Sequence, residues 1–298
     1  MTRALVLAAA LVLGGCRFWY KPVPVANAVG EEETVLGGDT VNVYRGERFE
    51  VYGPNTEAVY DGYEQLSRSY RAFERHFGRP APLLAVLMLP DSLLPVDSAL
   101  SRSFRARGFT LIHYSRPRIV RSRPRYRGIN YGGVLWPIAP TAVRAMLARF
   151  ADAQLGGTTL TDSVLLNRFP LWYRAAVVRV FGDASTYGRD IQLVREKRDV
   201  LIPLRDMLPL VRAPSADSLL DPSRDEEDID EYTETLAAQA STFARYLLDR
   251  EGPQVLERLG RGYVAGRSFQ QMMAEFQSVP SSVDELERRW IAWVTTRE

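Results

Sequence analysis

The second half of the chain is built from apolar runs with helical spacing, so any sheet has to come from the first half. After residue 140, apolar side chains recur three and four positions apart, and glycine and proline break the runs. The runs cover residues 141–155, 171–182, 236–248, 255–259, 269–276 and 283–294. This order predicts an α+β fold, with a mixed sheet lobe with helices over residues 41–139 and an all-helical lobe over residues 140–298.

Strand signals are confined to the first half. The letters NVYRGERFEVYGP (residues 42–54) alternate well enough for one or two strands, with a turn at residues 45–47. The continuous apolar run LLAVLMLP (residues 83–90) predicts a buried strand. Further strands are predicted within GFTLIHY (residues 108–114) and, at an edge, within YGGVLWPIAP (residues 131–140).

Capping residues mark where several of the helices begin and end. Asn55 or Thr56 is placed to cap a helix whose apolar stripe ends at Gly78. Ser282 and Glu285 have the spacing of a capping box at the start of the last helix.

The first 15 residues have the composition of a bacterial lipoprotein signal. A basic start precedes the apolar stretch of residues 4–13, which is too short to span a bilayer. The letters LGGC (residues 13–16) follow, and they resemble the site where such signals are cleaved and the cysteine is lipidated. We expect residues 1–15 to be removed, Cys16 to carry lipid and residues 16–40 to form a tether. A plain secretory signal with an incidental cysteine is the alternative.

The single cysteine, the residue after it and the net charge bear on disulfides, on the cellular location and on the class of partner. Cys16 is the only cysteine, so the chain forms no intrachain disulfide. Arg17 rather than an aspartate follows it, which by resemblance to Gram-negative lipoproteins favours the periplasmic face of the outer membrane. A formal net charge of +2 gives no general case for a nucleic-acid partner.

An ordered set of segments carries a family resemblance. The set includes RFEVYGP, two central helices with the letters MLARFADAQLGG (residues 146–157) and PLWYRAAVVRVFG (residues 170–182), then LIPLRDML, the turn GRSF (residues 266–269) and SVDELERRWIAWV. No single motif is diagnostic, but the order resembles the peptidase MA-like, or gluzincin-like, domains of bacterial lipoproteins over about residues 41–298. The resemblance implies a zincin-like fold.

The chemistry of active members of that family is missing from this sequence. In the family, one helix carries His-Glu-x-x-His and the next supplies a glutamate in a Trp-x-x-Glu-Gly pattern; the histidines bind Zn²⁺ and the first glutamate activates water. Laid on this chain, the patterns place the three zinc ligands at Arg149, Ala153 and Ala175, and the catalytic glutamate at Phe150. None of these side chains can bind zinc or act as a base.

The sequence contains no other recognisable catalytic motif that could replace the zinc site. The only histidines, His76 and His113, lie outside the central helices, and we expect both to be structural. The motifs of serine hydrolases and of phosphate-binding loops are absent. A pair of carboxylates from distant segments leaves no spacing signature, so a zinc-independent hydrolase stays open. We expect no metal and no cofactor.

Two segments of opposite charge remain. Nine arginines and no acid lie between Arg102 and Arg127, and nine acids lie between Asp217 and Glu234. The first segment is a possible binding face for an anionic partner through Arg116, Arg118, Arg121, Arg123, Arg125 and Arg127. A solvated loop, or a loop paired with the acidic segment, is the alternative.

These features predict a lipid-anchored envelope protein with a catalytically inactive metallopeptidase-like domain. Its expected role is to bind or scaffold a peptide, a protein or an anionic envelope polymer, with the membrane as its other partner. The competing reading is a hydrolase with a relocated carboxylate site.

Overall fold

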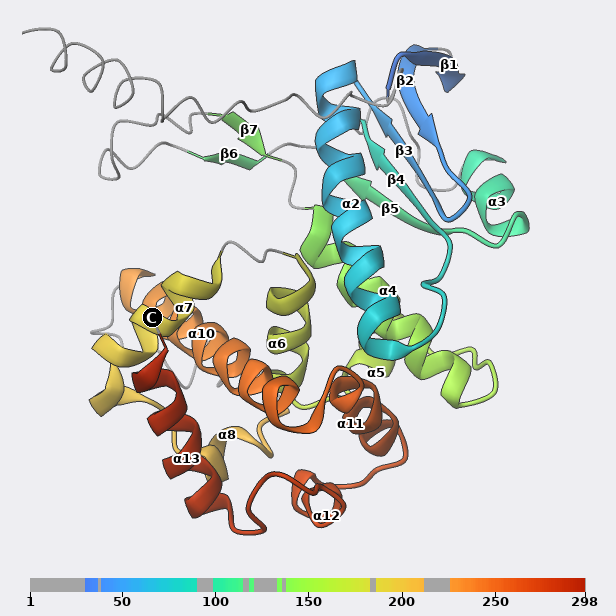
Figure 1. Cartoon of the computed structure of the whole chain (residues 1–298). Coiled ribbons are helices and arrows are strands. Elements are labelled where there is room, and N and C mark those ends of the chain that lie inside the picture. Colours follow the sequence, from blue (N-terminus) through green and yellow to red (C-terminus); the bar gives the residue numbers. More distant parts are fainter. Residues whose placement is uncertain are drawn as a thin grey trace, which may run out of the picture.

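The computed structural model of the chain describes residues 30–36, 39–89, 99–114, 118–120, 133–135, 138–182, 186–211 and 226–297 (Figure 1). Within these residues it contains a five-stranded mixed sheet, a separate two-stranded sheet and eleven α-helices. The predicted α+β class is confirmed.

The main sheet comes entirely from the first half of the chain. Its strands lie in the order β1 (Glu32–Leu36), β2 (Asp39–Arg45), β3 (Phe49–Gly53), β4 (Leu84–Met88) and β5 (Thr110–Tyr114). The first three strands pair antiparallel, and β3, β4 and β5 pair parallel. All five residues of β4 are buried, as its unbroken apolar run predicts.

The predicted strand near residue 133 belongs to a different sheet. β7 (Gly133–Leu135) pairs antiparallel with β6 (Arg118–Val120), and neither joins the five-stranded sheet. The segment is therefore a strand, as expected, but it lies outside the main sheet.

The prediction that residues 16–40 form only a tether is wrong at its end. Residues 32–36 form β1 and residues 39–40 begin β2. In β1 only Leu36 is buried, so the strand has little apolar pattern and is held by backbone pairing with β2. Pairing of that kind leaves almost no signal in the sequence of the strand itself.

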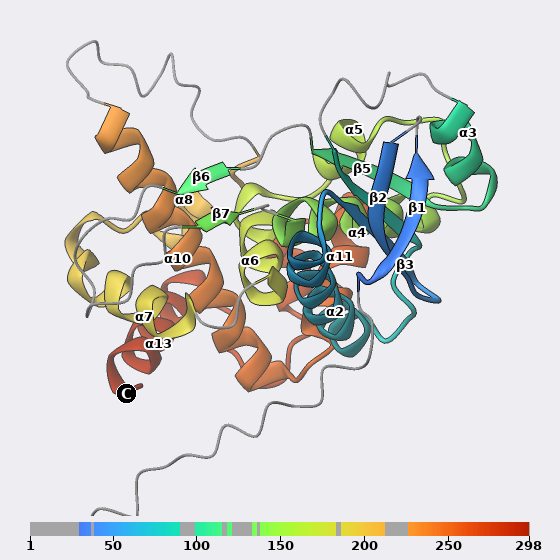
Figure 2. The same cartoon turned by 90° about the horizontal axis from the view of Figure 1, so that it is seen from above.

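Helix α2 (Thr56–Phe77) covers one face of the sheet (Figures 1 and 2). Its predicted ends are confirmed: the Asn55 side chain accepts a hydrogen bond of 2.8 Å from the Ala58 amide, and Gly78 adopts a left-handed φ of 60°. Phe104 of helix α3 (Ala99–Ala106) packs in a smaller core on the opposite face.

The described residues of the second half form nine α-helices. They are α4 (Ile138–Gln154), α5 (Asp162–Leu166), α6 (Leu171–Gly182), α7 (Tyr187–Glu196), α8 (Leu204–Met207), α10 (Glu226–Glu251), α11 (Val255–Val264), α12 (Phe269–Met273) and α13 (Val283–Thr296). The long helix α10 packs along α6 and α7 (Figure 1). The runs with helical spacing are confirmed as helices, whereas α5, α7 and α8 are additions to the predicted set.

The start of α4 and the cap of α13 differ from the prediction, and side-chain contacts account for both. Helix α4 begins at Ile138, three residues earlier than its apolar run, because the Gln65 side chain on α2 accepts hydrogen bonds of 3.1 Å from the Ile138 and Ala139 amides. The Ser282 side chain makes no cap hydrogen bond, since Glu285 pairs with Arg288 and Arg289 instead. The capping box forms at the start of α12, between Ser268 and Gln271.

One hydrophobic core joins the two lobes. It runs from Phe49 in β3, through α2, α4 and α6, to Val294 in α13. The helical half thus packs directly beneath the sheet and its covering helix. Among the described helices, none combines the length and the apolar character needed to cross a membrane.

Candidate functional site

The two helices expected to carry the zinc ligands pack against each other. The end of α6 lies beside the beginning of α4, since a Cβ placed on Gly182 would stand 3.5 Å from the Cβ of Ala139. Both helices contribute buried side chains to the main core. This is the region where the sequence places Arg149, Phe150, Ala153 and Ala175.

Phe150, the residue at which the family resemblance would place the catalytic glutamate, is buried, with 3% of its surface exposed. Its ring packs edge-on against Phe77 with 4.8 Å between centroids, and Phe169 lies at 6.5 Å. The Arg79 guanidinium stands 5.0 Å from the ring centroid. Such a contact between a cation and an aromatic face is favourable and covers the ring on its remaining side.

Helix α11 packs against the region around the Phe150 ring. A Cβ added to Gly260 would lie 3.0 Å from the Phe150 ring and 2.7 Å from the Tyr173 hydroxyl oxygen. That hydroxyl donates a hydrogen bond of 2.5 Å to the Leu256 carbonyl, so it is fixed in place. The glycine therefore lets α11 approach α4 and α6, and little space remains for a metal ion and water.

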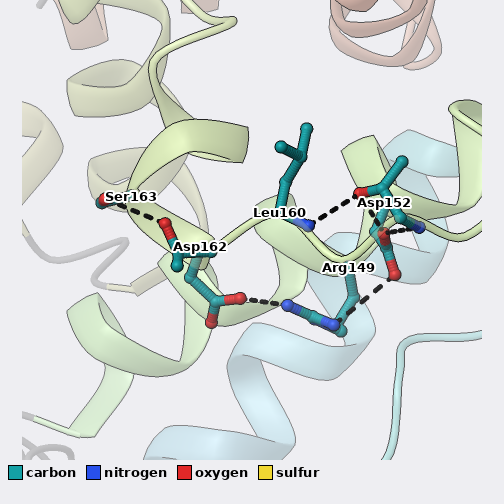
Figure 3. A network of polar contacts seen from close by, with 7 residues as sticks. Arg149, Asp152, Leu160, Asp162 and Ser163 are labelled. Carbon is teal, nitrogen blue, oxygen red and sulfur yellow. Dashed lines mark hydrogen bonds and ion pairs between the residues drawn. The ribbon is translucent and has the colours of Figure 1, made fainter.

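Arg149 belongs to a surface network rather than to this interior (Figure 3). It forms an ion pair with Asp152 at 3.5 Å and a second with Asp162 at the start of α5. Asp152 also accepts hydrogen bonds from the Thr158 amide and hydroxyl, at 2.7 and 2.9 Å. These two bonds, and then the Arg149 charge, hold the pKa of the Asp152 carboxyl below its usual range.

This network stabilises the turn that follows α4, at residues 155–158. Gly156 and Gly157 have φ angles of 82° and 78°, which glycine adopts without strain. The α6 arginines do not join this network: Arg174 donates to the Val211 carbonyl and Arg179 pairs with Asp190 at 2.9 Å. The Arg149 contacts thus stabilise the turn.

The four positions at which the resemblance would place the zinc ligands and the catalytic glutamate do not share one environment. Phe150 is in the core, and Ala175 is half-buried against it. Arg149 turns toward α5, and Ala153 is exposed. The structure therefore brings the two helices together, but it places the positions of the paired histidines on the outer side of α4.

Both histidines make structural contacts. The His76 ring stacks on Phe181 at 5.4 Å and hydrogen bonds to the Pro253 carbonyl at 2.9 Å. Burial lowers the pKa of His76 below the usual value. The His113 Nε2 lies 2.9 Å from the Leu89 carbonyl, which links β5 to the residue after β4.

Buried carboxylates in the described residues are already paired with arginines. The pairs are Glu50–Arg107, Asp190–Arg179 and Glu257–Arg261, with N–O distances of 2.8, 2.9 and 2.7 Å. They lie in three separate elements, β3, α7 and α11. Across the same described ranges, no group of three or more His, Cys, Asp and Glu side chains is placed to hold a metal ion. None of these carboxylates forms the second half of a catalytic pair.

An open pocket of about 360 Å³ lies elsewhere in the helical lobe. Its walls come from the α5–α6 junction, the segment around α8, the α11–α12 turn and the first residue of α13. Its apolar floor is made by Leu208, Tyr263, Phe269 and Val283. No residue of α4 lines it, so it is distinct from the region of the degenerate ligands.

Three arginines stand around the mouth of this pocket, namely Arg168, Arg205 and Arg267. Arg267 is neutralised by an ion pair with Glu275. Arg205 reaches Asp206 only at 4.0 Å, in a pair whose two side chains are mostly exposed. Such a pair contributes little, so Arg205 stays available to a ligand. Within the described part of the chain, Arg168 forms no ion pair.

Sequence reasoning missed this pocket because its residues are far apart in the chain. Arg168 and Val283 are more than a hundred positions apart, and no short motif connects them. The turn GRSF (residues 266–269), noted above only as part of the family resemblance, forms one wall. That turn was the one local signal for the site.

Several predicted features lie outside the described residues. These are Cys16 with its signal and most of its tether, and Arg116, Arg121, Arg123, Arg125 and Arg127. Of Arg118 only the backbone is described, in β6. The lipidation and the arginine-rich binding face therefore remain predictions.

Searches of family models, curated proteins and solved structures find no significant match to this chain.

Proposed function

We propose that this chain is a lipid-anchored protein of the bacterial cell envelope whose metallopeptidase-like domain is catalytically inactive and serves to bind a partner. The observation that carries the proposal is the burial of Phe150 among Phe77, Phe169 and Arg79 at the position of the catalytic glutamate. A zinc site needs desolvated polar ligands and an open position for water. Here the same volume is filled by aromatic rings.

The zincin-like part of the proposal is supported by the order and packing of the elements. A mixed sheet with a covering helix precedes α4 and α6, and these two helices pack face to face. The ligand positions on them hold Arg149, Ala153 and Ala175. An arginine cation repels Zn²⁺, and an alanine offers it no electron pair.

A binding role is favoured over a relocated hydrolase by the state of the acids. The buried carboxylates are each neutralised by an arginine, so they are poor candidates for a catalytic pair. The helical lobe does, however, keep an open pocket with an apolar floor and arginines at its mouth. Binding without chemistry is what such a surface offers.

The proposal can be tested on the full chain purified from membranes in mild detergent. We expect metal analysis after incubation with zinc to show far less than one equivalent bound. The intact mass should show lipid on the wild type and none on the Cys16→Ser variant. One tightly bound equivalent of zinc would overturn the inactive assignment, and an unlipidated wild type would overturn the anchor.

A further inference from the structure

The pocket between α8 and α12 combines two kinds of surface. Its floor is apolar, with the buried side chains Leu208, Tyr263 and Phe269. It is also lined by Arg168, which forms no ion pair within the described residues, and by Arg205, whose one ion pair, with Asp206 at 4.0 Å, is mostly exposed to water. A ligand that satisfies both surfaces has an apolar body joined directly to an anionic group.

The arginines indicate which anionic group fits. A guanidinium is planar and presents parallel N–H donors that match the two oxygens of a carboxylate. Two such groups, Arg168 from the α5–α6 junction and Arg205 from α8, line the same pocket. A single carboxylate can therefore be held between them without a metal.

Polar groups at the mouth separate a peptide from a fatty acid. Ser268 and Gln270 also line the pocket; the Ser268 hydroxyl oxygen accepts a hydrogen bond from the Gln271 amide, and its proton can still be donated. A peptide bond entering the pocket loses water from its N–H and C=O groups, and it needs partners of this kind. A fatty acid has no such groups. A volume of about 360 Å³ also suits one or two side chains better than a long acyl chain.

We infer that this pocket binds the free C-terminal carboxylate of a peptide or protein whose last residue is apolar. The inference rests on the proposed function as a binding protein, and it names the ligand class and the place of binding. The carboxylate lies between Arg168 and Arg205, and the last side chain packs on Phe269 and Val283. The neighbouring peptide groups face Ser268 and Gln270.

The test uses the full chain in lipid nanodiscs and a fluorescein-labelled pentapeptide that ends in phenylalanine with a free carboxylate. Fluorescence anisotropy should show saturable binding, with empty nanodiscs as the blank. Amidation of the C-terminus should weaken binding about tenfold or more, because a charge-assisted hydrogen bond is lost. Replacement of the last phenylalanine by serine should weaken it to a similar degree.

Variants locate the binding in the pocket. The double variant Arg168→Gln, Arg205→Gln should bind the free peptide about tenfold more weakly and lose the difference between the free and amidated peptides. The matched variant Arg71→Gln, Arg198→Gln removes two exposed arginines elsewhere and should bind like the wild type. Both variants should unfold at the wild-type temperature, since the four side chains are exposed.

Three results would overturn the inference. They are equal binding of the free and amidated peptides, unchanged binding by the pocket variant, and binding of decanoate, but not of the peptide, that depends on Arg168 and Arg205. Failure of this inference is separable from failure of the proposed function. A chain that binds zinc and still captures the peptide loses only the inactive assignment, whereas a zinc-free chain that ignores the peptide loses only the pocket.

Discussion

Two volumes on either side of helix α11 have opposite physical character. Gly260 faces the interior between α4 and α6, where Phe150 and Tyr173 fill the space. Tyr263, one turn further along α11, lines the open pocket beside α12. The Tyr173 and Tyr263 rings are only 5.4 Å apart, so a single aromatic layer separates the two regions.

The difference shows how a helical lobe can close one cavity and keep another. Aromatic side chains close the first volume, because each buries a large apolar area and packs edge-on against its neighbours. Exposed arginines border the second, because their charged groups stay in water and do not collapse onto the apolar floor. The filled interior should therefore determine stability, and the pocket should determine binding.

The largest expected effect comes from emptying the filled interior. Phe150→Ala removes a buried ring that packs between Phe77 and Arg79, and we expect it to lower the free energy of unfolding by about 3–5 kcal/mol. The neighbouring Arg149→Ala should cost about 1 kcal/mol or less, because its ion pairs are partly exposed. Urea unfolding followed by circular dichroism measures both. Equal losses for the two variants would contradict the comparison.

A smaller effect is expected from overfilling the same interior. Gly260→Ala places a Cβ 2.7 Å from the Tyr173 hydroxyl, which is held by its own hydrogen bond, so the free energy of unfolding should fall by about 1–3 kcal/mol. Gly188 in α7 has nothing within 4 Å of the same added atom. Gly188→Ala is therefore the matched control, and it should stabilise the chain by up to about 1 kcal/mol. Stabilisation by both variants would show that the interior has room to spare.

The smallest effect concerns pH. Burial lowers the pKa of His76 in the folded chain, so the unfolded chain takes up the proton more readily as the pH falls below about 6.5. This contribution to stability is complete above that pH and is lost as the pH falls toward the lowered pKa.

Thermal unfolding between pH 7.5 and pH 5.5 should therefore show a decline that is smaller in His76→Gln. Peptide binding to the pocket should stay constant over the same range, because arginines and a C-terminal carboxylate keep their charges there. A decline in binding that parallels the decline in stability would show that the two regions are not independent.

Local sequence patterns predicted much of the fold. The buried strand β4, the helix α2 with its Asn55 cap and the two central helices follow from apolar spacing and capping chemistry. These features depend on residues that are close together in the chain. For the same reason, the sequence alone shows that positions 149, 150, 153 and 175 hold neither a zinc ligand nor a base.

The features that were missed depend on distant partners. Strand β1 exists because β2 pairs with it, and α4 starts early because Gln65 caps it from another helix. In α7, Asp190 is fully buried, a position that its pairing with Arg179 on α6 makes acceptable. The pocket likewise joins segments from Arg168 to Val283. Spacing patterns along the chain do not predict contacts between residues that are this far apart in sequence.

The single core beneath the sheet also determines how the chain can be divided. Because buried side chains from β3 to α13 belong to one cluster, a cut between residues 139 and 140 would split that core and not separate two autonomous folding units. Neither fragment would retain a complete set of packing partners. The sheet and the pocket are thus parts of one cooperative body, and a ligand held in the helical half would also stabilise the strands of the sheet.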